Sequence, residues 1–172
     1  MAFNFIELDK TNLPKTKGMR VDGHRFYNIN GTNYPSVTTV LGIRKTEQLK
    51  EWREKIGEKV ANWEMGRAAR RGKSFHTLVE QYLKGETPSI RDVLPLGLFK
   101  LMKPYIDQIN NIHLLEAIMY SPKLTIAGQV DCVAEYNGKL SVIDFKTANK
   151  ERQESWIDNY FLQSTAYAHM YE

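Results

Sequence analysis

The sequence predicts a mixed α/β fold of the α+β type, in which a central mixed sheet carrying an antiparallel hairpin is flanked by helices. Three observations carry this prediction. Apolar residues recur every three or four positions between Glu47 and Leu83, which is the period of an amphipathic helix. After His113 the apolar positions alternate, as in half-buried strands. Asn-Gly, the strongest short hairpin signal, occurs twice between strand-like runs.

The N-terminal third combines an arm, a hairpin and a short helix. Residues 1–18 have no clear period and predict an irregular arm. Residues 24–34 predict a hairpin with Asn30-Gly31 as its turn. Residues 37–41 then predict a short helix, because Ser36 is a good N-cap and Gly42 a common stop.

The middle of the chain predicts helices. The long helical pattern over 47–83 contains Gly66 and Gly72, where we expect a break or bend, with a second helix starting near Gly72. A further helix is expected over 96–110. The strand-like runs that follow cover 114–121, 125–136 and 139–148, and a last helix is expected over about 153–171.

We expect one domain over residues 1–172. It divides into the arm, hairpin and short helix (1–45), a helical region (46–110), and a catalytic sheet with its trailing helix (111–172). The chain stops one helix after its last motif, so it is either a fragment or a compact version of a longer family.

Composition narrows the classes of function. No apolar run approaches the length of about 18 residues that a membrane span needs, and the N-terminus does not have the pattern of a secretory or transit signal. We therefore expect no membrane partner and a cytoplasmic protein. The single cysteine, Cys132, excludes an internal disulfide and a four-cysteine iron–sulfur cluster, and its apolar neighbours predict a buried thiol.

The second Asn-Gly turn fixes the register of the hairpin that carries the chemistry. With a two-residue turn at Asn137-Gly138, Tyr136 pairs with Lys139. Counting back along one strand and forward along the other brings Asp131 opposite Asp144. Their Cβ atoms should then lie about 4.5–5.5 Å apart on one face.

Two carboxylates placed in this way repel each other, and a divalent cation between them removes the conflict. Hard oxygen ligands suit Mg²⁺ or Mn²⁺. Lys146 lies two residues beyond Asp144 and therefore points to the same face. An ammonium group there can orient or deprotonate an attacking water and neutralise charge on a phosphorane. The alternative is an ordinary surface cluster of ion pairs.

At this point the sequence resembles a known family. Gly128-x-x-Asp131 followed by Asp144-Phe-Lys146-Thr-Ala resembles the core of the PD-(D/E)xK nucleases, and in particular their RecB-like exonuclease branch, which has phage and mitochondrial members. The resemblance implies a restriction-endonuclease-like core, a Mg²⁺- or Mn²⁺-dependent nuclease, and DNA as partner, single-stranded or with free ends. Val130 stands where the name-giving proline would be.

Three outlying segments extend the resemblance over residues 34–168. Pro35-Ser36-Val37-Thr38 resembles an N-terminal motif of the branch, Gly72 to Leu83 resembles a helix with a metal-binding histidine, and Gln163-x-x-x-Tyr167 resembles its trailing motif. The resemblance implies His76, Asp131, Asp144 and the backbone carbonyl of Phe145 as metal ligands. It implies catalytic roles for Asp131, Asp144, Lys146, Gln163 and Tyr167.

Several assignments stay open on the sequence alone. Glu80, one turn after His76, either supports that histidine, binds a second metal or faces solvent. Glu116 is interpreted as a sheet-edge charge in preference to an additional carboxylate ligand. Tyr167 is either functional or part of a core with Trp156, Tyr160 and Phe161.

A basic segment gives a candidate for DNA binding. The net charge is +4, and ten Lys/Arg against five Glu lie between residues 44 and 73. The mixed-sign part is interpreted as a solvated helix face. The last part, residues 66–73, has four basic residues and no acidic one: Arg67, Arg70, Arg71 and Lys73. Two interpretations stay open for them, contact with phosphates and simple solvation.

Three functions remain in competition. The first is an exonuclease acting on DNA ends in replication, repair or recombination. The second is a structure-specific endonuclease on the same core. The third is a non-catalytic DNA-binding module, which is disfavoured because both aspartates and the lysine are present.

Overall fold

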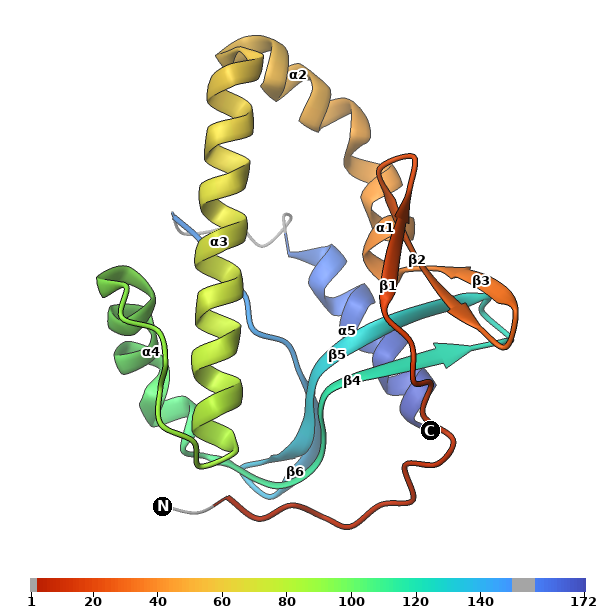
Figure 1. Cartoon of the computed structure of the whole chain (residues 1–172), viewed down its shortest axis with the longest axis vertical. Coiled ribbons are helices and arrows are strands. Elements are labelled where there is room, and N and C mark those ends of the chain that lie inside the picture. The colour runs from red at the N-terminus through yellow and green to blue at the C-terminus, as the bar shows by residue number, and fades with distance from the viewer. Residues whose placement is uncertain (1–2, 150–156) are drawn as a thin grey trace.

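The structure is a computed structural model that describes residues 3–149 and 157–172. Its elements follow the chain in the order β1 (Gly18–Val21), β2 (His24–Ile29), β3 (Thr32–Pro35), α1 (Val37–Gly42), η1 (Ile43–Lys45), α2 (Thr46–Ile56), α3 (Glu58–Leu83), α4 (Val93–Ile106), β4 (Ile109–Ser121), β5 (Ile126–Tyr136), β6 (Lys139–Ile143) and α5 (Asp158–Tyr171). Figure 1 shows α3 and α4 on one side of the β4–β6 sheet and α1 and α5 on the other.

The expected mixed α/β class is confirmed, with two three-stranded sheets in the orders β1-β2-β3 and β4-β5-β6. All four ladders are antiparallel. Among the described residues, parallel pairing is confined to two isolated bridges, Phe5 with Ile112 and Ser36 with Ala127. The second bridge joins the two sheets close to α1.

The N-terminal sheet is larger than the sequence reading predicts. The hairpin around Asn30-Gly31 is confirmed, with φ of 51° and 83° as a type I′ turn requires. The irregular arm, however, ends in strand β1, which pairs with β2 through a turn at Asp22-Gly23. That turn also has positive φ, 49° and 80°. Asp-Gly is a hairpin signal of the same kind, and it lies just outside the segment assigned to the predicted hairpin.

The helical region breaks at a different glycine from those predicted. Ser36 caps α1 as expected, since its hydroxyl accepts the N–H of Thr39. The helical path does not end at Gly42, because η1 and α2 follow α1 directly. The break between α2 and α3 falls at Gly57, where φ is 83°. Gly66 and Gly72 lie inside the continuous helix α3, because an interior glycine costs only about 1 kcal/mol against alanine.

The later boundaries also move. The predicted helix over 96–110 is shifted to 93–106, and β4 begins already at Ile109. Strand β6 stops at Ile143 rather than extending to residue 148. The last helix begins at Asp158, and the predicted positions 153–156 lie outside the described residues.

The core has two faces around β4 and β5. On one face α3 and α4 pack against the sheet, and Phe75, Leu78 and Ile106 are almost fully buried. On the other face α1 and α5 pack through Val37 and Tyr167. Cys132 is fully buried, as expected, and burial raises the pKa of its thiol to about 12. No helix among the described residues is long and apolar enough to cross a membrane.

Candidate metal and nuclease site

The β5–β6 hairpin has the register that the Asn137-Gly138 turn predicts. The turn residues have φ of 50° and 76°, and the five pairs run from Tyr136 with Lys139 to Cys132 with Ile143. Asp131 and Asp144 are the next residues beyond the last pair. There the ladder gives way to a side-chain contact, because the Phe145 N–H donates to Asp131 Oδ2 at 2.7 Å.

Strand β4 brings a third carboxylate to the same level. Leu115 pairs with Cys132 and Ala117 with Val130, so Glu116 stands opposite Asp131 at the step that the ladder omits between these two pairs. Glu116 has φ of 49°, a left-handed conformation that costs a non-glycine residue on the order of 1–3 kcal/mol. Adjacent strands therefore carry Glu116, Asp131 and Asp144 in one row across the sheet.

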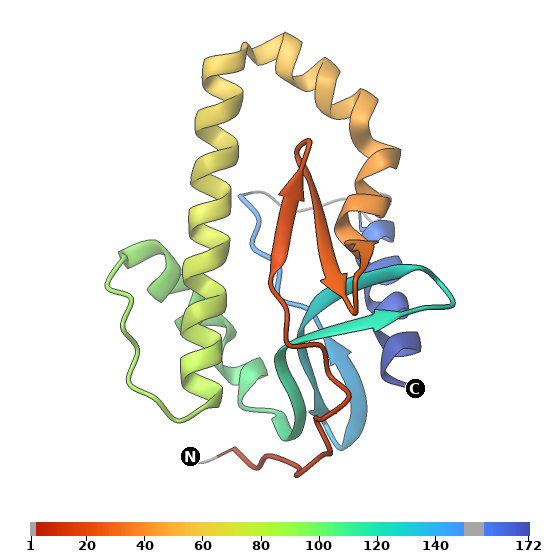
Figure 2. The same ribbon diagram turned by 45° about the vertical axis from the view of Figure 1, so that its right-hand side comes forward.

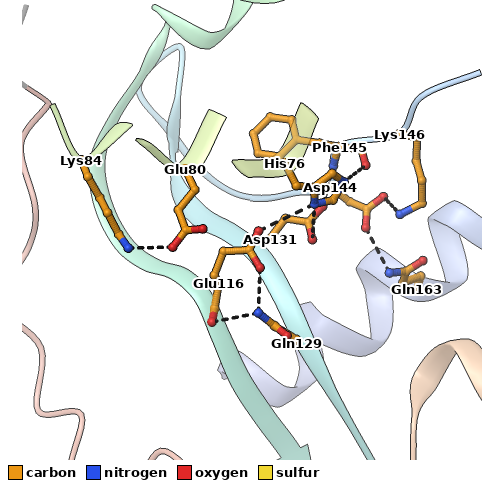
Figure 3. A network of polar contacts seen from close by, with 10 residues as sticks. All are labelled: His76, Glu80, Lys84, Glu116, Gln129, Asp131, Asp144, Phe145, Lys146 and Gln163. Carbon is orange, nitrogen blue, oxygen red and sulfur yellow. Dashed lines mark hydrogen bonds and ion pairs between the residues drawn. The ribbon is translucent and has the colours of Figure 1, made fainter. Parts of the chain in front are cut away.

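His76 reaches this row from α3, as Figure 3 shows. Its Nε2 lies 2.7 Å from the carbonyl oxygen of Phe145. Its Nδ1 lies 3.6 Å from Asp131 Oδ1 and 3.7 Å from Glu116 Oε1. A neutral imidazole that donates Nε2–H to the carbonyl keeps its Nδ1 lone pair directed at the two carboxylates.

The ligand atoms of His76, Glu116 and Asp131 all lie within 4.8 Å of one another. Imidazole and carboxylate donors of this kind bind divalent cations, and metal-binding histidines commonly donate their second ring N–H to a carbonyl or carboxylate. The contact with Phe145 is of that type. The residues present therefore fit a divalent cation.

Two side chains of the cluster, Asp131 and His76, have shifted pKa values. Burial raises the pKa of Asp131 to about 6, an effect that nearby Asp144 reinforces and His76 opposes. Burial also opposes charging of His76, but Glu116, Asp131 and the Phe145 carbonyl outweigh it and raise the pKa of the imidazole. A proton thus stabilises the cluster where a metal ion would.

Asp144 lies beside this group and has partners of its own. Its side chain is 7% exposed; Oδ1 accepts from Gln163 Nε2 at 3.0 Å, and Oδ2 forms an ion pair with Lys146. The Lys146 ammonium lies 5.4 Å from the centre of the Tyr160 ring. Lys146 is therefore held between a carboxylate and an aromatic face, next to the His76 cluster.

Tyr167 and Gly128 dock the trailing helix on the sheet. Tyr167 is 2% exposed, burial raises the pKa of its phenol, and it hydrogen-bonds Gln163. A Cβ on Gly128 would lie 2.7 Å from the Tyr167 ring, which is closer than real contacts allow. Tyr167 is therefore a core residue that also supports Gln163, whereas Phe161, grouped with it in the core interpretation, is 64% exposed. Trp156 lies outside the described residues.

A cavity of about 650 Å³ opens in front of the cluster. His76, Glu116, Asp131 and Gln163 line one end, and Arg25 and Lys73 are among its other lining residues. A polar cavity of this size, with convergent carboxylates and flanking cations, suits an anionic substrate that is bound together with a metal ion.

The model of the PD-(D/E)XK nuclease superfamily matches residues 45–172 of this chain. The chain belongs to the PD-(D/E)XK nuclease superfamily. The resemblance seen in the Asp131, Asp144 and Lys146 motif is confirmed at that level. The match covers the helices, the catalytic hairpin and the trailing helix, and it leaves out β1–β3 and α1.

Three relatives share the name mitochondrial genome maintenance exonuclease 1. The protein of Homo sapiens is 34% identical over 146 residues, which is 77% of this chain and 42% of the relative. Those of Mus musculus and Xenopus tropicalis are 30% and 31% identical, over 69% and 72% of this chain and 38% of each relative. The chain thus spans about two fifths of the length of these relatives.

The PD-(D/E)XK site uses only part of the basic segment that the sequence analysis singled out. Lys73 lines the cavity. Arg71 is buried and donates to Asn149, so it ties α3 to the segment after Lys146. Arg67 pairs with Glu64 and stacks on Trp63 at 4.5 Å, and Arg70 is exposed.

Two residues that line the cavity were not assigned to the site from the sequence. Glu116, interpreted as a sheet-edge charge, faces His76 and Asp131. Its register follows from a longer turn, residues 122–125, whose pairing geometry the sequence does not specify. Arg25 gave no motif, and only the joining of the two sheets brings it to the cavity. Glu80 lines the same cavity and pairs with Lys84 at 2.6 Å.

Proposed function

We propose that this chain is a divalent-metal-dependent deoxyribonuclease that acts as an exonuclease on DNA, with a preference for single strands. The observation that carries the proposal is the row of Glu116, Asp131 and Asp144, faced by His76 on one side and Lys146 on the other. The name of the relatives supports the exonuclease assignment.

The metal ligands in this proposal are His76 Nδ1, Glu116, Asp131 and Asp144. The carbonyl of Phe145, which the sequence resemblance implies as a ligand, instead accepts from His76 Nε2 and orients the imidazole. Mg²⁺ suits the oxygen donors, and Mn²⁺ accepts the imidazole more readily. When bound, such an ion supplies Lewis-acid stabilisation of the phosphate and a more acidic water. Its charge also offsets the burial of Asp131 and the repulsion from Asp144, which raise the pKa of that carboxyl.

The protein side chains around the ion divide the remaining work. Lys146, with its donors next to Asp144, orients the attacking water and neutralises charge that develops on the phosphate. Gln163 holds the orientation of Asp144 by its hydrogen bond at 3.0 Å. Tyr167 holds Gln163 in turn, so its role is to position the site rather than to touch the substrate.

Phosphate contacts in the proposal come from Lys73 and from the exposed Arg70 on the same helix. Lys73 lines the cavity, and Arg70 is exposed three residues earlier on α3. Arg67 would have to leave Glu64 and Trp63 first. Arg71 supports the site through Asn149. We therefore propose unequal contributions from the four basic residues.

The test is digestion of linear and circular single-stranded DNA and of duplex DNA, with Mg²⁺, Mn²⁺ or EDTA. An exonuclease degrades the linear strand progressively and leaves the circle intact. Cutting of the circle would indicate the endonuclease instead. Binding without any cutting under all metal conditions would indicate a DNA-binding module and overturn the proposal.

Asp131→Asn is the informative variant, because it removes one ligand charge and preserves the hydrogen bond from the Phe145 N–H. We expect it to abolish cutting and remain folded. Asp92→Asn, an exposed aspartate before α4 whose side chain forms no capping hydrogen bond, is the matched control and should cut normally. An Asp131→Asn protein that cuts at the wild-type rate would refute the assignment.

A further inference from the structure

Two arginines of the N-terminal sheet stand directly opposite each other. In the β1–β2 ladder Arg20 is the cross-strand partner of Arg25, so both side chains leave the same face. The Cβ atoms of such partners are about 4.5–5.5 Å apart, and like charges placed this way destabilise a sheet. A stabilising role in the folded chain therefore does not explain this pair.

Neither guanidinium has a carboxylate partner within the part of the chain that the structure describes, residues 3–149 and 157–172. Arg20 donates only to the carbonyl of Gly23 in the adjoining turn. By contrast, Arg53, Arg67 and Lys103 each have an acidic partner. The Arg20–Arg25 pair is thus open to an external anion.

The pair is connected with the nuclease site. The cavity at the metal cluster has Arg25 and Thr38 in its lining. A second hollow of about 500 Å³ is lined by Arg20, His24, Arg25 and Thr38, among others. Because Arg25 and Thr38 line both, the two hollows adjoin at these residues. Figure 2 shows the β1–β2 hairpin between α3 and the α1–α2 segment.

We propose that Arg20 and Arg25 bind consecutive backbone phosphates of the substrate strand, Arg25 the one nearer the metal cluster. The inference rests on the proposed function, in that the substrate is a polynucleotide. A guanidinium is suited to this task because its planar donors match phosphate oxygens in pairs. Each bound phosphate also relieves the repulsion between the two arginines. The β1–β3 sheet is thereby a substrate-binding surface, and α3 with Lys73 forms its opposite wall.

The first experiment measures binding of a single-stranded oligonucleotide in Ca²⁺ across a salt series. Arg20→Gln and Arg25→Gln should each weaken binding several-fold and flatten the log–log salt dependence by about 0.7 per lost contact. Lys139→Gln is the matched control, since it removes one exposed charge at the far end of the β5–β6 hairpin, and its slope should equal that of the wild type.

Folding does not confound these variants. The backbone bonds at Arg25, to the Ser36 N–H and the Thr39 hydroxyl, do not involve its side chain. Loss of one like charge should leave the melting temperature in EDTA unchanged or raise it. A marked fall in melting temperature would instead assign the pair a structural role.

The second experiment places one neutral methylphosphonate at successive positions of the oligonucleotide. The wild type should lose affinity at two adjacent positions, and Arg25→Gln and Arg20→Gln should each become insensitive at one of them. Oligonucleotides with and without a 5′- or 3′-phosphate distinguish a terminal from an internal phosphate, and coupling to either supports the subsite. Equal losses at every position, or none, would overturn it.

An acidic protein segment is the competing ligand for this surface. A polyglutamate peptide of matched charge should bind much more weakly than the oligonucleotide and without dependence on Arg25. If Arg25→Gln weakened binding of the peptide as much as binding of the oligonucleotide, the assignment of this surface to the substrate strand would be refuted. All of these measurements are independent of cutting. If the wild type cleaves DNA and both arginine variants bind the oligonucleotide as the control does, the phosphate inference fails and the nuclease proposal stands. If the methylphosphonate pattern depends on Arg20 and Arg25 but no metal condition supports cleavage, the nuclease proposal fails and the phosphate inference stands.

Discussion

His76 and Phe145 are joined by a 2.7 Å contact between the imidazole Nε2 and the backbone carbonyl oxygen. The contact ties α3 to the segment after β6, two parts of the chain that lie 69 residues apart. It also fixes which ring nitrogen faces the carboxylates. In the proposed metal site His76 therefore binds through Nδ1, and the Phe145 carbonyl orients the ring.

Glu116→Gln tests the carboxylate that the sequence analysis interprets as a sheet-edge charge. The amide keeps the shape but not the charge, so we expect Mn²⁺ affinity to fall by at least about tenfold. Calorimetry or electron paramagnetic resonance with Mn²⁺ alone measures this without DNA. Glu51→Gln on exposed α2 is the control and should bind normally. Unchanged Mn²⁺ affinity in Glu116→Gln would remove it from the ligand set.

Metal-free stability should fall as the pH rises. The pKa of Asp131 is raised from 3.8 to about 6, so the folded protein holds a proton that the unfolded chain releases. This stabilisation is present below about pH 4 and is lost as the pH rises through about 6. The raised pKa of His76 acts in the same direction, with stabilisation lost above its folded value.

Thermal melting in EDTA between pH 4.5 and 8 measures this effect. Asp131→Asn should flatten the pH profile and have a higher melting temperature than the wild type at pH 8. For a pKa difference of this size, the gain in the free energy of unfolding is at most about 3 kcal/mol. Excess Mg²⁺ should protect the wild type and not the variant. A wild-type melting temperature that rises steadily with pH in EDTA would contradict the prediction.

Lys146→Gln separates catalysis from binding. Because Lys146 lies beside Asp144 rather than along the cavity wall, we expect a single-turnover rate at least about a hundredfold lower with little change in DNA affinity. Lys73→Gln should show the reverse, weaker binding and a near-normal rate at saturating DNA. A Lys146→Gln protein with a normal single-turnover rate would remove the lysine from the mechanism.

Gly128→Ala should perturb both packing and activity. Its Cβ would lie 2.7 Å from the Tyr167 ring, and overpacking of this kind typically costs about 1–3 kcal/mol. Displacement of Tyr167 would also loosen Gln163 and, through it, Asp144. Melting and single-turnover rates measure the two effects.

Two comparisons make the Gly128 test specific. Gly97→Ala lies in α4 with open space at the Cβ position and should be neutral or stabilising. Adding Tyr167→Leu to Gly128→Ala should recover part of the lost stability, since it removes the atoms in conflict. Additive losses in the double variant would show that the two residues do not meet in solution.

Local signals in the sequence explain which parts of the fold were predictable. Asn30-Gly31 and Asn137-Gly138 each specify one turn geometry, and the register that brings Asp131 to Asp144 follows by counting. The predicted break at Gly66 or Gly72 is wrong, because both glycines lie inside α3. Of the three glycines between residues 57 and 72 only Gly57 has a positive φ, and no local sequence signal distinguishes it from the other two.

The candidate site was predictable where its residues share one hairpin or one helix. The hairpin register and strand periodicity alone predict that one face carries Asp131, Asp144 and Lys146. Glu116 and Arg25 arrive on other strands, through a longer turn and through contact between the two sheets, and neither follows from local spacing. Arg71 had a favourable pattern for DNA contact, and its burial against Asn149 became evident only from the folded chain.

The glycine at 57 has a consequence for how the molecule opens. None of the residues of α2, which the structure describes in full, is buried, and the first turns of α3 bury only Ala61. Amide hydrogens there should exchange with solvent by local fraying, at free energies well below that of global unfolding. Amides of α3 from Phe75 onward, packed on the sheet, should exchange only with the whole domain. The amides of α3 would thus exchange rapidly at its N-terminal end and slowly, together with the core, at its C-terminal end.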